Sequence, residues 1–209
     1  MLFTPPPQEF SFGSQASRPK GFTLIELLVV MAVIAILSGI TFSISSGVRN
    51  AQARAKAKAE LATLASSLES FKGLYGDYPF IAETSDTTNA NTLLKALTGW
   101  SKLDATATPP MSDLDPQAST FLDTGLLGLS KEIVGDTKPD TDTYLVDPWE
   151  NPYIYVYNIE AGDWENFGYL LMSSGPDGEL TLGDAATTGI IDQAWRDDEK
   201  NLDNIYLEN

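Results

Sequence analysis

Two groups of residues in this chain have types and spacings that can carry chemistry. The first is Glu26, a carboxylate near the start of a long apolar run, and the second is the turn-rich segment 173–184, which contains Asp177 and Asp184. An acid within a membrane helix costs about 2.5–3.5 kcal/mol at the helix centre, so Glu26 is expected to have a partner. Carboxylate and carbonyl oxygens are the ligands that calcium prefers, so segment 173–184 is a candidate cation site.

The side chains that the chain lacks exclude several kinds of site. It contains no histidine and no cysteine, which excludes Ser-His-Asp triads, Cys-His dyads, His-ligated zinc and disulfides. A metal site must therefore be built from oxygens, which favours calcium or magnesium. No spacing of the remaining titratable residues indicates catalysis, so we expect that the protein is not an enzyme. A membrane-anchored hydrolase using Asp177 and Asp184 is the weakest alternative, because nothing supplies a nucleophile.

Residues 22–44 form an apolar run with the length of a membrane-spanning helix. About 20 helical residues cross the hydrocarbon core, whereas a cleaved secretory signal has an apolar stretch of about 7–15 residues. Arg18 and Lys20 precede the run, and positive charge tends to stay in the cytoplasm. We therefore predict a removable leader over residues 1–21, a membrane segment over residues 22–45, and export of the remainder.

The 209-residue chain has a net charge of −16, which becomes −17 without residues 1–21. Such a surface argues against nucleic-acid binding, which needs a basic footprint. About 160 residues remain after the leader and the membrane segment, enough for one small domain with a core. Arg49, Arg54, Lys56 and Lys58 follow the apolar run. They form either a solvated helix face or a surface that faces acids of neighbouring subunits.

The helix is predicted to continue beyond the membrane segment, and residues 46–79 form its amphipathic half. Apolar side chains recur there at helical spacing along one stripe. The stripe consists of Leu61, Leu64, Leu68, Phe71 and Tyr75. A helix over residues 22–75 is about 80 Å long at 1.5 Å per residue. A small domain cannot cover that length, so lipid or other subunits must bury its N-terminal half.

The remaining sequence predicts a small α+β domain. Residues 80–145 are expected to contain a short helix at 88–98, a loop at 101–120 and a helical piece at 121–134. Residues 146–209 hold an antiparallel sheet and the acidic loop. The expected elements there are strands at 154–157 and 167–172, a short helix at 187–201 and an edge strand at 203–206.

Three motifs in the chain resemble those of one superfamily. They are the block Lys20-Gly21-Phe22-Thr23-Leu24-Ile25-Glu26, the helix end Tyr75-Gly76-Asp77-Tyr78-Pro79, and the turn Asp147-Pro148-Trp149-Glu150-Asn151-Pro152-Tyr153. The first resembles the processing site of type IV pilins and type II secretion pseudopilins. The resemblance implies that prepilin peptidase cuts after Gly21 and that the new N-terminal Phe22 is methylated. It also implies that Glu26 acts in assembly.

The second and third motifs resemble the major, G-type pseudopilins of type II secretion. This resemblance implies a pilin-like α+β fold, in which a long N-terminal helix precedes a small domain with an antiparallel sheet. It also implies that residues 80–145 are the variable region between the helix and the sheet. We expect Trp149 to be a core aromatic residue, because prolines fix the turn and the ring packs under the sheet.

The G-type pseudopilins also have a calcium-binding loop that resembles residues 173–184. The resemblance implies Ca²⁺ ligands at Ser174, Asp177, Leu182 and Asp184. Ala185 stands where the family usually has a further acid. Asp192, Asp203 or water could replace that acid.

The resemblance implies a mechanical function. The chain is expected in the bacterial inner membrane as a single-pass protein with a periplasmic domain. From there, copies of the chain would polymerise into a pseudopilus. Other pseudopilins and the inner-membrane assembly platform are the expected partners. The alternative is a subunit of a surface type IV pilus that serves adhesion, motility or DNA uptake.

Overall fold

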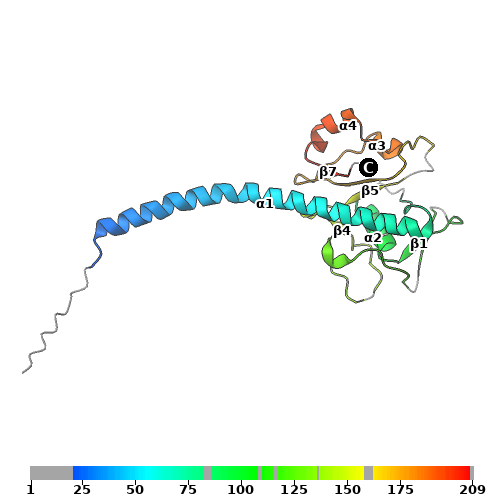
Figure 1. The fold of residues 1–209 in the computed structure, drawn as a ribbon, viewed down its shortest axis with the longest axis horizontal. Helices are drawn as coiled ribbons and strands as arrows, with labels where there is room; N and C mark the ends of the chain where they lie inside the picture. Colours follow the sequence, from blue (N-terminus) through cyan, green and yellow to red (C-terminus); the bar gives the residue numbers. More distant parts are fainter. Residues whose placement is uncertain are drawn as a thin grey trace, which may run out of the picture. The chain divides into compact units, whose positions relative to one another are not determined.

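The computed structural model describes residues 21–81, 86–107, 110–114, 117–135, 137–157 and 162–207, with the backbone alone described for residues 40–46. The chain divides into two compact units, Met1–Ser45 and Ser46–Asn209. One long helix, α1 (Leu24–Tyr75), begins in the first unit and ends in the second (Figure 1). The predicted long helix is thus confirmed, and most of the predicted leader, residues 1–20, lies outside the described residues.

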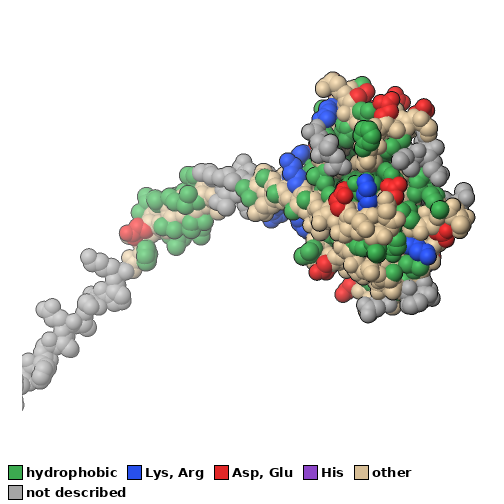
Figure 2. Space-filling model, turned by 45° about the vertical axis from the view of Figure 1, so that its right-hand side comes forward, with side chains coloured by type: hydrophobic (Ala, Val, Ile, Leu, Met, Phe, Trp, Pro, Cys, Tyr) green, Lys and Arg blue, Asp and Glu red, His purple; other side chains and the backbone are tan. Residues whose placement is uncertain are grey.

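In the first unit, the helix leaves its apolar side chains exposed. Phe22 is 86% exposed and Leu24 is 82% exposed, and Figure 2 shows hydrophobic side chains over this part of α1. Among the described residues, no helix is both long and apolar enough to cross a membrane. The predicted membrane segment, residues 22–45, includes side chains that lie outside the description, and it stays a prediction.

In the second unit, α1 supplies one wall of the core. The predicted stripe is confirmed, because Leu61, Leu64, Leu68 and Phe71 are fully buried. Tyr75 is partly buried and packs on Phe71, with ring centroids 4.6 Å apart. The helix ends where the N–H of Gly76 donates to the Lys72 carbonyl, with Gly76 in the left-handed conformation that glycine adopts without strain.

The central sheet has three antiparallel strands in the order β5 (Ile154–Val156), β6 (Leu170–Ser173) and β7 (Ile205–Tyr206). Tyr155 pairs with Leu171, and Ser173 pairs with Ile205. The predicted hairpin and the final edge strand are therefore confirmed.

Both faces of this sheet are covered. Tyr153, Tyr155 and Tyr157 alternate onto the face that joins the core of α1 and α2 (Asp86–Leu97). Ile154 and Val156 point to the opposite face, where they meet a second cluster that contains Trp195. The C-terminal segment thus gives the sheet a second covering layer.

The C-terminal helical region consists of three short pieces, whereas the sequence predicted one helix at 187–201. They are α3 (Ala185–Thr188), α4 (Gln193–Asp197) and the 3₁₀ turn η2 (Glu199–Asn201). Gly189 separates the first two in a left-handed conformation, at φ 71°, which ends α3.

Helix α2 confirms the predicted helix at 88–98. The part of the 80–145 region that follows α2 differs from the prediction. The predicted loop at 101–120 is wrong in part, because β1 (Ser101–Leu103) and β2 (Met111–Asp113) pair antiparallel. The predicted helical piece at 121–134 is also wrong in part, because this range holds the 3₁₀ turn η1 (Thr124–Leu126) and then a short strand. The following strand β3 (Gly128–Leu129) pairs with β4 (Leu145–Val146). These pairings depend on partners distant in sequence, which local composition does not report.

A buried tyrosine–glutamate pair joins α1 to the sheet region. The Tyr153 hydroxyl donates to Glu60 Oε2 at 2.6 Å, and Glu60 is only 3% exposed. Lys56 Nζ lies 3.5 Å from Glu60 Oε1. Burial and the nearby Glu60 carboxylate raise the pKa of Tyr153, so the phenol stays a donor.

Replacing Tyr153 with phenylalanine is expected to lower the free energy of unfolding by about 1–3 kcal/mol, because Glu60 loses its donor while it stays buried. Denaturant unfolding of the shortened chain 46–209 measures this change. Tyr144→Phe is the matched control, since Tyr144 is partly exposed, and it should change the stability by less than about 0.5 kcal/mol. Equal stabilities of the two variants would contradict the assigned role.

Candidate processing, assembly and cation sites

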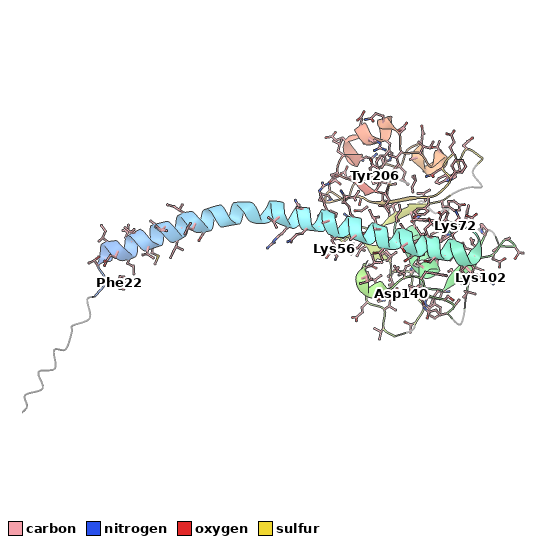
Figure 3. All side chains as sticks on the ribbon, in the orientation of Figure 1. Phe22, Lys56, Lys72, Lys102, Asp140 and Tyr206 are labelled. Atoms are coloured by element: carbon pink, nitrogen blue, oxygen red, sulfur yellow. The ribbon has the colours of Figure 1, made fainter. Side chains whose placement is uncertain are left out.

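The predicted processing bond lies just before the helix. Gly21 and Phe22 precede the first residue of α1, and Phe22, labelled in Figure 3, is exposed. A Cβ atom built on Gly21 would have no neighbour within 4 Å. The peptide bond between Gly21 and Phe22 is thus accessible to a peptidase, and the fold itself does not require glycine at position 21.

Glu26 lies in the first turn of α1 and has a local partner. The N–H and the hydroxyl of Thr23 both donate to Glu26 Oε2 at 2.8 Å, and the Glu26 N–H donates to Thr23 Oγ1 at 3.3 Å. This reciprocal pattern is a capping box, which satisfies donors at the start of a helix. The Thr-x-x-Glu spacing of Thr23 and Glu26 is the sequence signal for this capping box. The prediction that Glu26 has a partner did not use that signal.

The signature turn at residues 147–153 is organised by Asp147, whose structural role the sequence prediction missed. Its Oδ1 accepts from the N–H groups of Trp149 and Asn151, each at 2.9 Å, and the Ser173 hydroxyl donates to its Oδ2 at 2.6 Å. Burial raises the pKa of Asp147, and these donors partly offset that effect. The predicted core role of Trp149 is supported, because its partly buried ring packs against the main core.

The acidic loop lies against this turn. Asn151 Nδ2 donates to the Gly175 carbonyl at 2.8 Å. A Cβ atom on Gly175 would approach the Asp203 carbonyl oxygen to 2.7 Å, and one on Gly178 would approach Asn151 Oδ1 to 2.9 Å. Both glycines have φ 71°, a conformation that favours glycine, and at Gly175 the close approach to the Asp203 backbone requires it as well.

The predicted calcium ligands, residues 174–184, lie in the segment that follows β6. Asp177 lies beside Asp203, and Asp177 Oδ1 accepts from the Glu179 N–H at 2.9 Å. Leu182 and Asp184 line a cavity of about 440 Å³ next to α3 and α4. Ser174 is buried at the end of β6. Within the described ranges, no group of three or more acidic side chains is arranged to hold a metal ion.

Asp203 is the acid that the structure brings to Asp177. Burial and then the negative charge of Asp177 raise the pKa of Asp203. The Oδ1 atom of Asp203 is buried and has no hydrogen-bond partner among the described residues. An orphaned carboxylate oxygen beside a second carboxylate fits a cation, which would satisfy the oxygen and reduce the repulsion.

The architecture and the N-terminal site agree with the class of protein that the sequence predicts. A long N-terminal helix that starts beside an exposed Gly-Phe bond and precedes a small antiparallel-sheet domain is consistent with a pilin-like α+β fold.

Comparisons with known proteins agree with this class. Residues 16–42 match the family described as "Prokaryotic N-terminal methylation motif". The chain is 27% identical over 170 residues to the "Type II secretion system core protein G" of Escherichia coli (strain K12), covering 81% of this chain and 90% of the relative. No solved structure matches significantly. The motif and the similarity together confirm the predicted resemblance to the major pseudopilins of type II secretion.

Proposed function

We propose that this chain is a structural subunit of a pseudopilus, which polymerises in the periplasm and drives type II protein secretion after processing by prepilin peptidase. The observation that carries the proposal is the exposed apolar start of α1, from Phe22 onward, directly after the methylation motif. An apolar helix without a covering layer in its own chain needs lipid before assembly and other subunits afterwards. The similarity to core protein G favours secretion over a surface pilus.

Deletion of the gene in cells with type II secretion tests this function. We expect exported proteins to accumulate in the periplasm, and the full chain to restore their release. The shortened chain 46–209 is the matched control, because it keeps the folded unit but lacks the apolar helix start, and it should not restore release. Normal secretion with loss of surface adhesion or motility would instead identify a surface pilus subunit.

The proposed partners and location follow from this function. The precursor waits in the inner membrane with the second unit in the periplasm, and copies of the chain join the pseudopilus through the assembly platform. The polymer is built mainly from this chain, with other pseudopilins as additional partners.

Processing is expected to produce a chain that begins at N-methylated Phe22. Intact-mass analysis of membrane-extracted protein measures this directly. The matched variant is Gly21→Leu, because the structure leaves space for a larger side chain there, so any loss of cleavage reflects recognition by the peptidase. A chain that still carries residues 1–21 in cells with an active peptidase would rule out this processing site.

We also propose that the acidic loop binds calcium through the Asp177 carboxylate. The orphaned Oδ1 of Asp203 supports Asp203 as the second carboxylate, in the place that Ala185 leaves without an acid. Main-chain carbonyls of Ser174 and Leu182 and the Asp184 carboxylate remain the other proposed ligands. Calcium would neutralise the paired acids and hold the loop against the signature turn.

A further inference from the structure

The charge of the second unit is separated along the chain. Residues 46–58 of α1 contain four basic and no acidic side chains, and we call them the basic segment. Residues 59–209 contain 27 acidic and 7 basic side chains. Figure 2 shows Lys and Arg side chains gathered on α1 where it meets the rest of this unit.

Contacts within the chain occupy only part of the basic segment. Lys56 pairs with Glu60, and Arg54 Nη1 lies 3.5 Å from the Asp203 carbonyl oxygen. Arg49 and Lys58 are exposed, and no ion pair with a described residue holds either of them. Two positive charges on a rigid helix thus remain available to another molecule.

The cavity beside α3 and α4 has the complementary charge. Four carboxylates line it and no Lys or Arg does, and we call it the acidic cavity. The four are Glu165, Asp184, Asp192 and Asp198. Asp192 Oδ1 caps α4 and Asp198 Oδ1 caps η2, and caps of this kind fix the position of both acids without neutralising them.

A second feature of the cavity indicates a missing partner. Trp195 lines it and is only 7% exposed, yet its indole N–H has no acceptor among the described residues. A buried donor without an acceptor costs about 1–3 kcal/mol. An oxygen from an incoming polypeptide can supply that acceptor, whereas a simple cation cannot.

We propose that the basic segment of one copy docks at the acidic cavity of a second copy. The inference rests on the proposed function, because it names a contact between subunits of the polymer. One contact of this kind would neutralise both surfaces and set the register between copies. An anionic lipid surface is the other occupant that could accept the basic segment, but it would leave the acidic cavity without a partner.

Crosslinking between copies tests the contact directly, because the chain contains no cysteine of its own. Copies with Gln52→Cys are co-expressed with copies with Thr188→Cys in cells that assemble filaments, and a bismaleimide is added; both substitutions leave the charges of the two surfaces in place. We expect a mixed dimer that is absent when either copy is expressed without the other. Lys102→Cys with Thr188→Cys is the matched control, since Lys102 lies on β1, outside both surfaces.

Charge removal gives an independent readout. The cavity variant Glu165→Gln, Asp192→Asn, Asp198→Asn keeps the caps, since asparagine caps helices about as well as aspartate. We expect it to lower the yield of sheared filaments about tenfold, the factor for 1.4 kcal/mol per contact. Arg49→Gln with Lys58→Gln should do the same, and Lys102→Gln should not. Circular dichroism of each variant verifies folding.

The outcomes separate this inference from the proposed function. Filaments that form without the mixed dimer, and with full yield in both charge variants, would overturn the docking contact alone. Failure of the unaltered chain to form filaments or support secretion would overturn the proposed function as well. If the basic-segment variant reduces binding to anionic vesicles but leaves the mixed dimer and the filament yield unchanged, a lipid surface is the occupant and the inference is wrong.

Discussion

Replacing Glu26 with alanine is expected to leave the chain in the membrane and to abolish its assembly into filaments. The carboxylate lies in the first turn of α1, close to the amino group that processing would create at Phe22. In a filament, the cationic N-terminus of an adjacent copy is a natural partner for an acid surrounded by apolar side chains. Removing one member of a buried ion pair costs about 3–5 kcal/mol, which is large for a repeated contact.

The capping box allows the charge of Glu26 to be separated from its effect on the helix. Glu26→Gln can keep the capping box but loses the charge. Thr23→Ala removes the hydroxyl that bonds Glu26 but keeps the charge. We expect Glu26→Gln to assemble as poorly as Glu26→Ala, and Thr23→Ala to assemble nearly normally.

Membrane fractionation and the yield of sheared filaments measure the two properties separately. Normal filaments from Glu26→Gln would show that the carboxylate acts only as a helix cap. Loss of the protein from the membrane fraction would show that Glu26 is needed for insertion, contrary to this prediction.

The long elements of the fold could be predicted from the sequence because their signals are local and repeated. The stripe from Leu61 to Phe71 recurs over several turns of α1, and each of its members is buried as expected. The alternation around Tyr155 predicted a strand, and β5 forms there. In these segments, side-chain periodicity and backbone propensity favour the same structure.

The short strands could not be predicted in this way. β3 contains only Gly128 and Leu129, and it exists because β4, formed by Leu145 and Val146, pairs with it. A Cβ atom on Gly128 would approach the Val146 carbonyl to 2.6 Å, so the glycine is required by the partner strand and not by a local turn. Two residues carry too little periodicity to indicate a strand.

The candidate sites also differ in whether their residues are neighbours in the sequence or are brought together by the fold. Gly21, Phe22 and Glu26 lie within six consecutive positions, so one motif identifies all three. The neighbour of Asp177 is Asp203, which enters the site only because β7 pairs with β6. The sequence offered Asp192 and Asp203 as equal candidates, and the strand pairing favours the second.

Calcium is expected to raise the stability of the second unit, which we would measure on the shortened chain 46–209. A ligand that binds only the folded state adds RT ln(1 + [L]/Kd), about 2.7 kcal/mol at 100 times the Kd. Thermal unfolding in calcium should therefore occur at a higher temperature than in chelator. Magnesium should substitute poorly, because it requires a smaller and more regular octahedron of ligands.

Three single substitutions identify the carboxylates that bind the ion. Asp177→Ala is expected to remove most of the calcium-dependent shift. If Asp203 is the second carboxylate, Asp203→Asn should also remove most of the shift, while Asp184→Asn should remove less. A larger loss of the shift in Asp184→Asn than in Asp203→Asn would identify Asp177 and Asp184 as the carboxylate ligands, as the sequence predicted. The buried Oδ1 of Asp203 would then have no role in binding calcium.

The decisive comparison is between chelator and calcium for the unaltered sequence. If the two unfolding curves coincide, the loop is an ordinary acidic turn, and Asp177 and Asp203 repel each other in the folded state. Asp203→Asn should then stabilise the second unit in any buffer, because it removes that repulsion. If calcium does bind, the same substitution should stabilise the unit in chelator and destabilise it in calcium, since the carboxylate costs stability when the ion is absent and supplies a ligand when it is present.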